Sequence, residues 1–144
     1  MRAFCAILLV ALAIVVHANE QTVGVKGTLW CGKEPIPHSD VQLLVHDTFS
    51  DNVLMTVSTN GSGYFQLTGS RNKAYSMRTY VKFFFFCNPN NAKPDPNAKC
   101  TRVVRADLPD NIAIDGKNPK WYDMPNVVMK PDGKMPNEDQ DCKN

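Results

Sequence analysis

Apolar and polar residues alternate in short segments along most of this chain, and clusters of Gly, Pro, Asn and Asp separate these segments. The pattern is typical of antiparallel β-structure, because successive side chains of a strand point to opposite faces of the sheet. In the strongest segment, residues 79–87, one face carries the apolar residues Val81, Phe83, Phe85 and Cys87. The 3.6-residue period of an amphipathic helix is sustained nowhere, so the sequence predicts an all-β fold.

Seven strands are predicted, at residues 22–30, 41–45, 53–58, 64–68, 79–87, 101–108 and 121–129. The segments between them are rich in residues that form turns, at 32–40, 59–63, 88–99 and 111–120. In the last strand the alternation slips around Pro125, which indicates a bulge or an edge position. The polar tail at 130–144 is predicted to be irregular except where Cys142 anchors it. Seven short strands without a helix predict a two-sheet β-sandwich.

Residues 1–18 form a predicted secretory signal, with Arg2 before an apolar run at 3–16 and cleavage expected before Asn19. A membrane anchor is the alternative, but the run is shorter than the roughly 20 apolar residues that a spanning helix needs. The remaining residues, 19–144, suit a single secreted, extracellular domain with its own hydrophobic core. Without Arg2 the formal charge falls from +2 to +1, which argues against nucleic acid as the main partner.

Four cysteines follow the predicted signal: Cys31, Cys87, Cys100 and Cys142. An even set of cysteines in an exported chain indicates two disulfides. A redox or metal site is the alternative, but the chain has no Cys-x-x-Cys and its histidines are not grouped with the cysteines. Four cysteines can form two disulfides in three ways, and the sequence alone does not choose among them. We favour Cys87–Cys100 with Cys31–Cys142, because the first bridge would join the ends of consecutive antiparallel strands.

The second face of the 79–87 strand carries the first candidate partner-binding residues, Tyr80, Lys82, Phe84 and Phe86. Exposed aromatic rings beside a lysine form an apolar patch of the kind that binds protein partners or lipid. The alternative is that the tail or the 88–99 loop covers these rings as a small secondary core.

Arg102 and Arg105, on the next predicted strand, extend this candidate surface together with Lys93 and Lys99 of the loop. Four basic side chains would form a modest cationic surface for anionic lipid head groups or sulfated sugars. The alternative is the ordinary lysine and arginine decoration of a solvated strand edge.

Asn60 begins the sequence Asn60-Gly61-Ser62, an N-glycosylation sequon in a predicted surface turn. Whether the site is occupied is open at this point. A glycan there would keep the loops at that end of the sandwich from packing against a partner.

Several motifs, in this order and spacing, resemble the nematode transthyretin-like family: residues 25–29 before Cys31, the turn 59–63 running into 65–67, residues 80–82 leading to Cys87, Cys100 with 101–103, residues 108–110, and residues 133–136 before Cys142. Together they cover nearly the whole predicted mature chain. The resemblance implies a transthyretin-like, immunoglobulin-like β-sandwich, secretion and an extracellular role without catalysis.

No catalytic motif is found in the sequence. Hydrolases of 5-hydroxyisourate share the transthyretin fold but end in Tyr-Arg-Gly-Ser, whereas this chain ends at 141–144 in Asp-Cys-Lys-Asn. There is also no Gly-x-Ser-x-Gly, phosphate loop or His-Glu-x-x-His sequence. We therefore expect no enzyme activity, cofactor or metal.

The sequence favours a secreted binding or signalling protein that recognises a cell-surface partner, protein or lipid, through a sheet face or loops. The alternative that the resemblance raises is an oligomeric carrier of a small hydrophobic ligand, as in transthyretin itself. The two hypotheses differ in oligomeric state, which the sequence leaves open.

Overall fold

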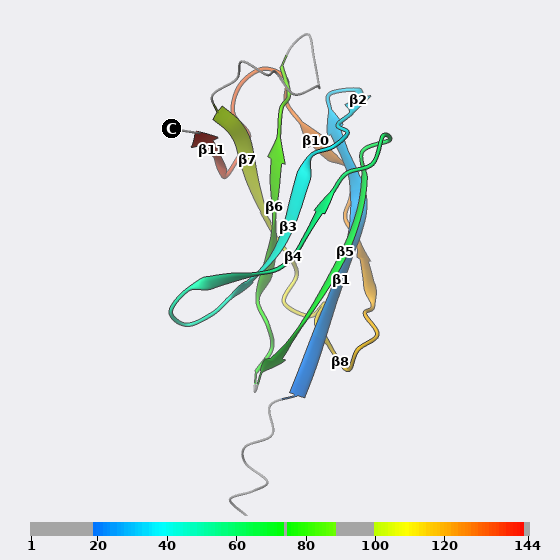
Figure 1. The fold of residues 1–144 in the computed structure, drawn as a ribbon, viewed down its shortest axis with the longest axis vertical. Coiled ribbons are helices and arrows are strands. Elements are labelled where there is room, and N and C mark those ends of the chain that lie inside the picture. Colours follow the sequence, from blue (N-terminus) through cyan, green and yellow to red (C-terminus); the bar gives the residue numbers. More distant parts are fainter. Residues whose placement is uncertain (1–18, 74, 89–99, 143–144) are drawn as a thin grey trace, which may run out of the picture.

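In the computed structural model, the described residues, 19–73, 75–88 and 100–142, form two β-sheets packed face to face (Figure 1). The predicted signal, Lys93 and Lys99 lie outside these residues. None of the described residues is helical, so this part of the chain holds no helix that could cross a membrane. The predicted all-β sandwich is confirmed.

The first sheet is built around β1 (Asn19–Cys31), which is paired along both of its edges. One edge pairs antiparallel with β5 (Tyr64–Lys73) and, near its end, with the short β2 (Glu34–Pro35). The other edge pairs with β8 (Ile114–Asp115), β9 (Trp121–Asp123) and β10 (Val127–Met129), of which the last two run parallel to β1.

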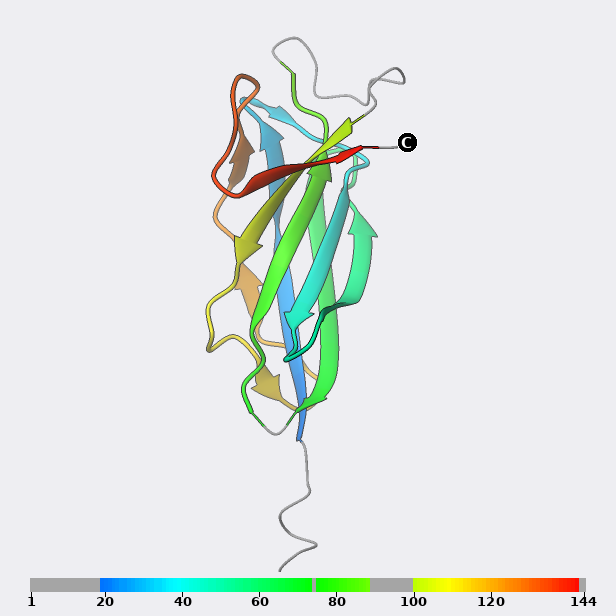
Figure 2. The same cartoon turned by 90° about the vertical axis from the view of Figure 1, so that its left-hand side faces the viewer.

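The second sheet has the strand order β11-β7-β6-β3-β4, and every neighbouring pair in it is antiparallel. Its strands are β3 (Asp40–His46), β4 (Asp51–Ser58), β6 (Thr79–Phe85), β7 (Cys100–Asp107) and β11 (Glu138–Cys142). Figure 2 shows β11 lying at an angle across this sheet, beside β7. The β3–β4 hairpin projects from the body of the molecule (Figure 1).

The core lies between the two sheets and contains the side chains that the alternation predicted to point inward. From β6, Val81, Phe83 and Phe85 are fully buried, and Cys87 follows them on the same face. Phe65 of β5 meets Phe83 edge to face, with ring centroids 5.5 Å apart, an arrangement that aromatic pairs prefer. The period-two prediction for the 79–87 segment is confirmed.

The predicted number of strands is wrong, because the described residues alone form eleven strands where seven were expected for the chain. The last predicted strand is divided into β9 and β10 at the segment that contains Pro125, where the alternation slips. Two connections contain the short strands β2 and β8, and the tail contains β11. These additional strands are too short, or too polar, to produce an alternating apolar pattern.

The favoured disulfide pairing is also wrong. The structure joins Cys31 to Cys87 and Cys100 to Cys142. Cys31 and Cys87 are buried and connect the end of β1 with the segment after β6, so their bridge links the two sheets. Cys142 lies directly opposite Cys100 in the β11–β7 pair, so the second bridge holds the tail against β7. The prediction failed because it treated the tail as irregular and paired cysteines by their order along the chain.

Candidate functional site

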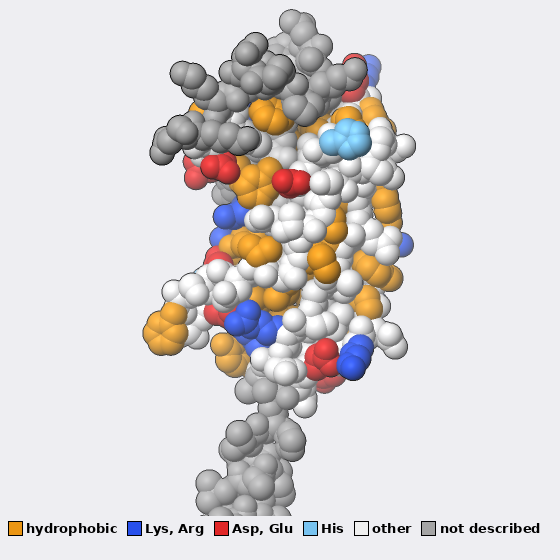
Figure 3. All heavy atoms as spheres, viewed as in Figure 1, with side chains coloured by type: hydrophobic (Ala, Val, Ile, Leu, Met, Phe, Trp, Pro, Cys, Tyr) orange, Lys and Arg blue, Asp and Glu red, His pale blue; other side chains and the backbone are white. Residues whose placement is uncertain are grey.

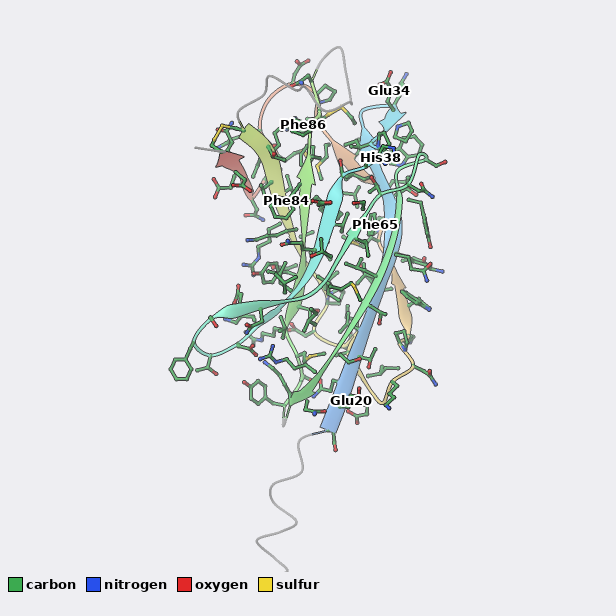
Figure 4. All side chains as sticks on the ribbon, viewed as in Figure 1. Glu20, Glu34, His38, Phe65, Phe84 and Phe86 are labelled. Atoms are coloured by element: carbon green, nitrogen blue, oxygen red, sulfur yellow. A yellow bond between two sulfur atoms is a disulfide. The ribbon has the colours of Figure 1, made fainter. Side chains whose placement is uncertain are left out.

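The outer face of the second sheet carries most of the predicted partner-binding residues. In the strand register Lys82 lies beside Arg105, and Phe84 lies beside Val103. The tail strand continues this face, because Asp139 is opposite Val103. Figure 4 shows Phe84 on β6 and Phe86 just beyond the end of this strand, both on a different chain segment from the core residue Phe65.

A hollow of about 630 Å³ lies over β6, β7 and β11. Phe84 and Val103 give it an apolar floor, while charged groups of both signs surround them: Lys82, Arg105, Asp139 and Asp141. Figure 3, which has the viewpoint of Figure 1, shows hydrophobic side chains lying beside acidic and basic ones on the side of the molecule that faces the viewer. Apolar area combined with a few charged groups is what a specific binding surface requires.

Phe84 and Phe86 are half-buried, so neither ring is freely exposed and neither is part of the central core. Phe86 lines a second, smaller hollow of about 240 Å³ with His38, Asp40 and Asp141. Phe84 of β6 and Asp141 of the tail strand line both hollows, so the two hollows are adjacent. The predicted apolar patch is therefore a recessed surface that the tail partly covers.

Tyr80 is on the outer face but is only 2 % exposed, so it supports the site from below. Its hydroxyl donates a hydrogen bond to Asp51 Oδ2 at 2.5 Å, and the Arg105 guanidinium carbon lies 3.7 Å from the centre of its ring. Burial, together with the hydrogen bond to Asp51, raises the pKa of Tyr80 to about 12. The same hydrogen bond, and a further one from His46, lower the pKa of the Asp51 carboxyl.

Arg105 is fixed by this arrangement while remaining accessible. Its Nε donates to Asp107 Oδ1 at 2.9 Å, and its side chain is 43 % exposed. The stacking on Tyr80 restricts the guanidinium to one place at the edge of the hollow. A cation held in position in this way binds a partner with less loss of side-chain entropy.

Arg102 does not belong to this surface, contrary to the expectation that it lies near the solvent with Arg105. It is paired in register with Phe85, a core residue, and its side chain is 16 % exposed. Its guanidinium donates to Glu138 Oε1 at 2.6 Å and to the carbonyl oxygens of Cys87 and Lys130 at 2.7 and 2.8 Å. Arg102 therefore ties together chain segments at one end of the sandwich.

Two residues of the hollow, Asp139 and Asp141, were missed by the sequence analysis because the tail was expected to be irregular. The sequence offers no signal for them, because every residue of β11 before Cys142 is polar. Asn60, in contrast, lies in an exposed turn between β4 and β5 and does not line the hollow. Among the described residues no group of three or more His, Cys, Asp and Glu side chains could hold a metal ion.

Comparison with known proteins agrees with the motifs noted in the sequence. The family described as the transthyretin-like family (TTR-52) matches residues 26–109. Transthyretin-like protein 16 of Caenorhabditis elegans is 32% identical over 138 residues, which cover 95% of each chain. Transthyretin-like protein 33 of the same nematode is 31% identical over 104 residues, 71% of this chain and 68% of that protein. The chain therefore belongs to the transthyretin-like family.

Proposed function

We propose that this chain is a secreted binding protein without catalytic activity that recognises an extracellular partner through the outer face of the β11-β7-β6-β3-β4 sheet. The observation that carries the proposal is the hollow over β6, β7 and β11, with its apolar floor and its charged surround. Membership of the transthyretin-like family supports a role outside the cell.

The charges of the hollow indicate the chemistry of the partner. Arg105 is already paired with Asp107, which leaves Lys82 beside two carboxylates, Asp139 and Asp141. This balance favours a partner that presents a cationic group to the tail strand and an apolar group to Phe84. A cell-surface protein with an exposed lysine or arginine beside an apolar side chain meets both requirements.

The alternative function, an oligomeric carrier of a hydrophobic ligand, stays a prediction. A carrier needs an apolar cavity, and the hollow over β6, β7 and β11 is lined mainly by charged and polar side chains. No feature of the described residues specifically favours this function.

The test uses the fluorescently labelled chain, secreted from insect cells, and intact dissociated cells of C. elegans, the source of the relatives. Flow cytometry measures saturable binding, with excess unlabelled chain as competitor. Replacing Phe84→Ser together with Phe86→Ser removes one ring from the floor of the larger hollow and one from the smaller hollow, and is expected to weaken binding by about tenfold or more. Thermal unfolding shows that the variant still folds.

The matched control is Tyr64→Ser, which removes an aromatic ring that is 38% exposed on β5, in the other sheet. The control is expected to bind as the unmodified chain does. The absence of saturable binding by the unmodified chain, or equal binding by the folded double variant, would refute the proposal.

A further inference from the structure

We infer that Asn60 carries an N-linked glycan and that this glycan covers the end of the sandwich at the β4–β5 turn. The inference rests on the proposed function in one respect, because the oligosaccharide is added only to chains that enter the secretory pathway. It goes beyond that function by assigning a modification site and by stating which surface the modification removes from partner binding.

The orientation of the Asn60 amide is fixed by its hydrogen bonds. The side-chain oxygen Oδ1 accepts from the backbone N–H of Ser62 at 2.9 Å and from that of Tyr64 at 3.0 Å. Both partners are donors, so the atom that faces them must be the oxygen. The side-chain nitrogen Nδ2, to which the sugar is attached, therefore points away from the turn.

The turn itself is firmly attached to the sheet beneath it. Leu29 N donates to Gly63 O at 2.8 Å, and Asn60 N donates to Tyr64 O at 3.0 Å. Gly63 has a φ of 77°, and a Cβ at this position would lie 2.5 Å from Leu29 O, so the inner side of the turn has no free space. A Cβ at Gly61 would have no neighbour within 4 Å, so the outer side is open. The glycan can extend only toward solvent.

The chemistry leaves the turn intact. Nδ2 loses one hydrogen and forms a bond to C1 of the first N-acetylglucosamine, while the C1–O bond to a lipid diphosphate carrier breaks and the diphosphate leaves with that electron pair. The amide carbonyl is unchanged by this transfer. Oδ1 therefore still accepts both hydrogen bonds from Ser62 and Tyr64 after the modification.

The glycosylation site lies outside the lining of the larger hollow. The larger hollow is lined by residues of β6 and β7 and by the tail around β11, and Asn60 is not among them. The bulky, hydrated glycan makes the β4–β5 turn unavailable to a protein partner. The outer face of β6, β7 and β11 remains open, so removing the glycan is expected to leave binding at the hollow unchanged.

The experiment measures the intact mass of the chain secreted by insect cells, before and after treatment with peptide N-glycosidase. Asn60 begins the only Asn-x-Ser/Thr sequence in the chain, so one site accounts for any N-linked glycan. Ser62→Ala destroys the sequon but keeps Asn60 and its turn, and is expected to abolish the added mass. Ser62→Thr, the matched control, keeps the sequon and is expected to retain it.

If the chain is secreted with the mass of the unmodified polypeptide, the glycan at Asn60 is refuted while the proposed secretion stands. A chain that stays inside the cells would contradict secretion and with it the inference. Added mass that persists in Ser62→Ala would also overturn the assignment. Added mass that the enzyme removes from the unmodified chain and from Ser62→Thr, but that is absent from Ser62→Ala, supports it.

Discussion

Removing each disulfide separately is expected to lower the free energy of unfolding by different amounts. The loss should be larger for Cys31–Cys87, which links the two sheets, than for Cys100–Cys142, which holds the tail. The bridges close loops with sequence separations of 56 and 42 residues. By restricting the unfolded chain, Cys31–Cys87 stabilises the fold by about 4.2 kcal/mol and Cys100–Cys142 by about 4.0 kcal/mol at 25 °C. Replacing the buried pair by alanine also leaves a cavity between the sheets, which adds about 1 to 2 kcal/mol. The Cys31→Ala and Cys87→Ala double variant is therefore expected to lose the larger share of the free energy of unfolding.

Urea denaturation of the two double variants, both with the remaining bridge oxidised, measures the difference. A peptide map without reduction provides the control, because it must recover Cys31 linked to Cys87 and Cys100 linked to Cys142 in the unmodified chain. Equal losses, a larger loss for the exposed pair, or a map with other linkages would refute the proposed roles of the two bridges.

Three further predictions concern the core and the charged groups. Phe83→Ala is expected to cost about 3 to 5 kcal/mol in urea unfolding and Phe84→Ala less than half of that, and equal costs would contradict their assignment to opposite faces. The Asp47 carboxylate accepts a hydrogen bond from the buried Lys73. This hydrogen bond is the main reason that the pKa of Asp47 lies below its ordinary value of 3.8. Its contribution to stability is therefore present above this value and lost as the pH falls below it, and Asp47→Asn should flatten the acid limb of the stability profile. The raised pKa of Tyr80 predicts a loss of stability as the pH rises from 10.0 to about 12, and an unchanged alkaline limb in Tyr80→Phe would contradict it.

The sequence predicted those parts of the fold in which burial imposes a period of two. Val81, Phe83 and Phe85 alternate because one face of β6 packs against the other sheet, and such a pattern is readable from one chain. The tail strand gave no comparable signal, because β11 is polar throughout and is held by pairing with β7, by the disulfide and by the Arg102–Glu138 ion pair. These interactions join residues far apart in sequence, so local patterns do not predict them.

The error at Arg102 came from the choice of face, whereas the disulfides were paired wrongly although Cys87 had been placed on the inner face. Arg102 is two residues from the buried Val104, so the alternation places both on the same face. The sequence analysis instead placed Arg102 near the solvent, because its side chain is charged. Cys31 is two residues after Leu29, and Cys87 is two residues after Phe85, so each cysteine shares an inner face with a buried apolar residue. Applying the alternation to the cysteines would have favoured the bridge that links the two sheets.

The candidate site was predicted in part. Lys82, Phe84 and Arg105 lie together on one face, because they come from neighbouring strands in a regular register. The acidic side of the hollow was not predicted, since its position depends on where the tail returns to the sheet. The sequence therefore predicted an aromatic and basic surface, whereas the structure adds carboxylates, on which the proposal of a cationic partner rests.

Charge reversal at the tail strand is the most direct test of the proposed binding surface. Asp141→Lys replaces an exposed carboxylate that lines both hollows, and Asp115→Lys makes the same change on β8 of the other sheet. In the cell-binding assay the proposed surface predicts about tenfold weaker binding for Asp141→Lys and binding within about twofold of the unmodified chain for Asp115→Lys. Equal binding by the two variants would contradict the claim that this face recognises the partner.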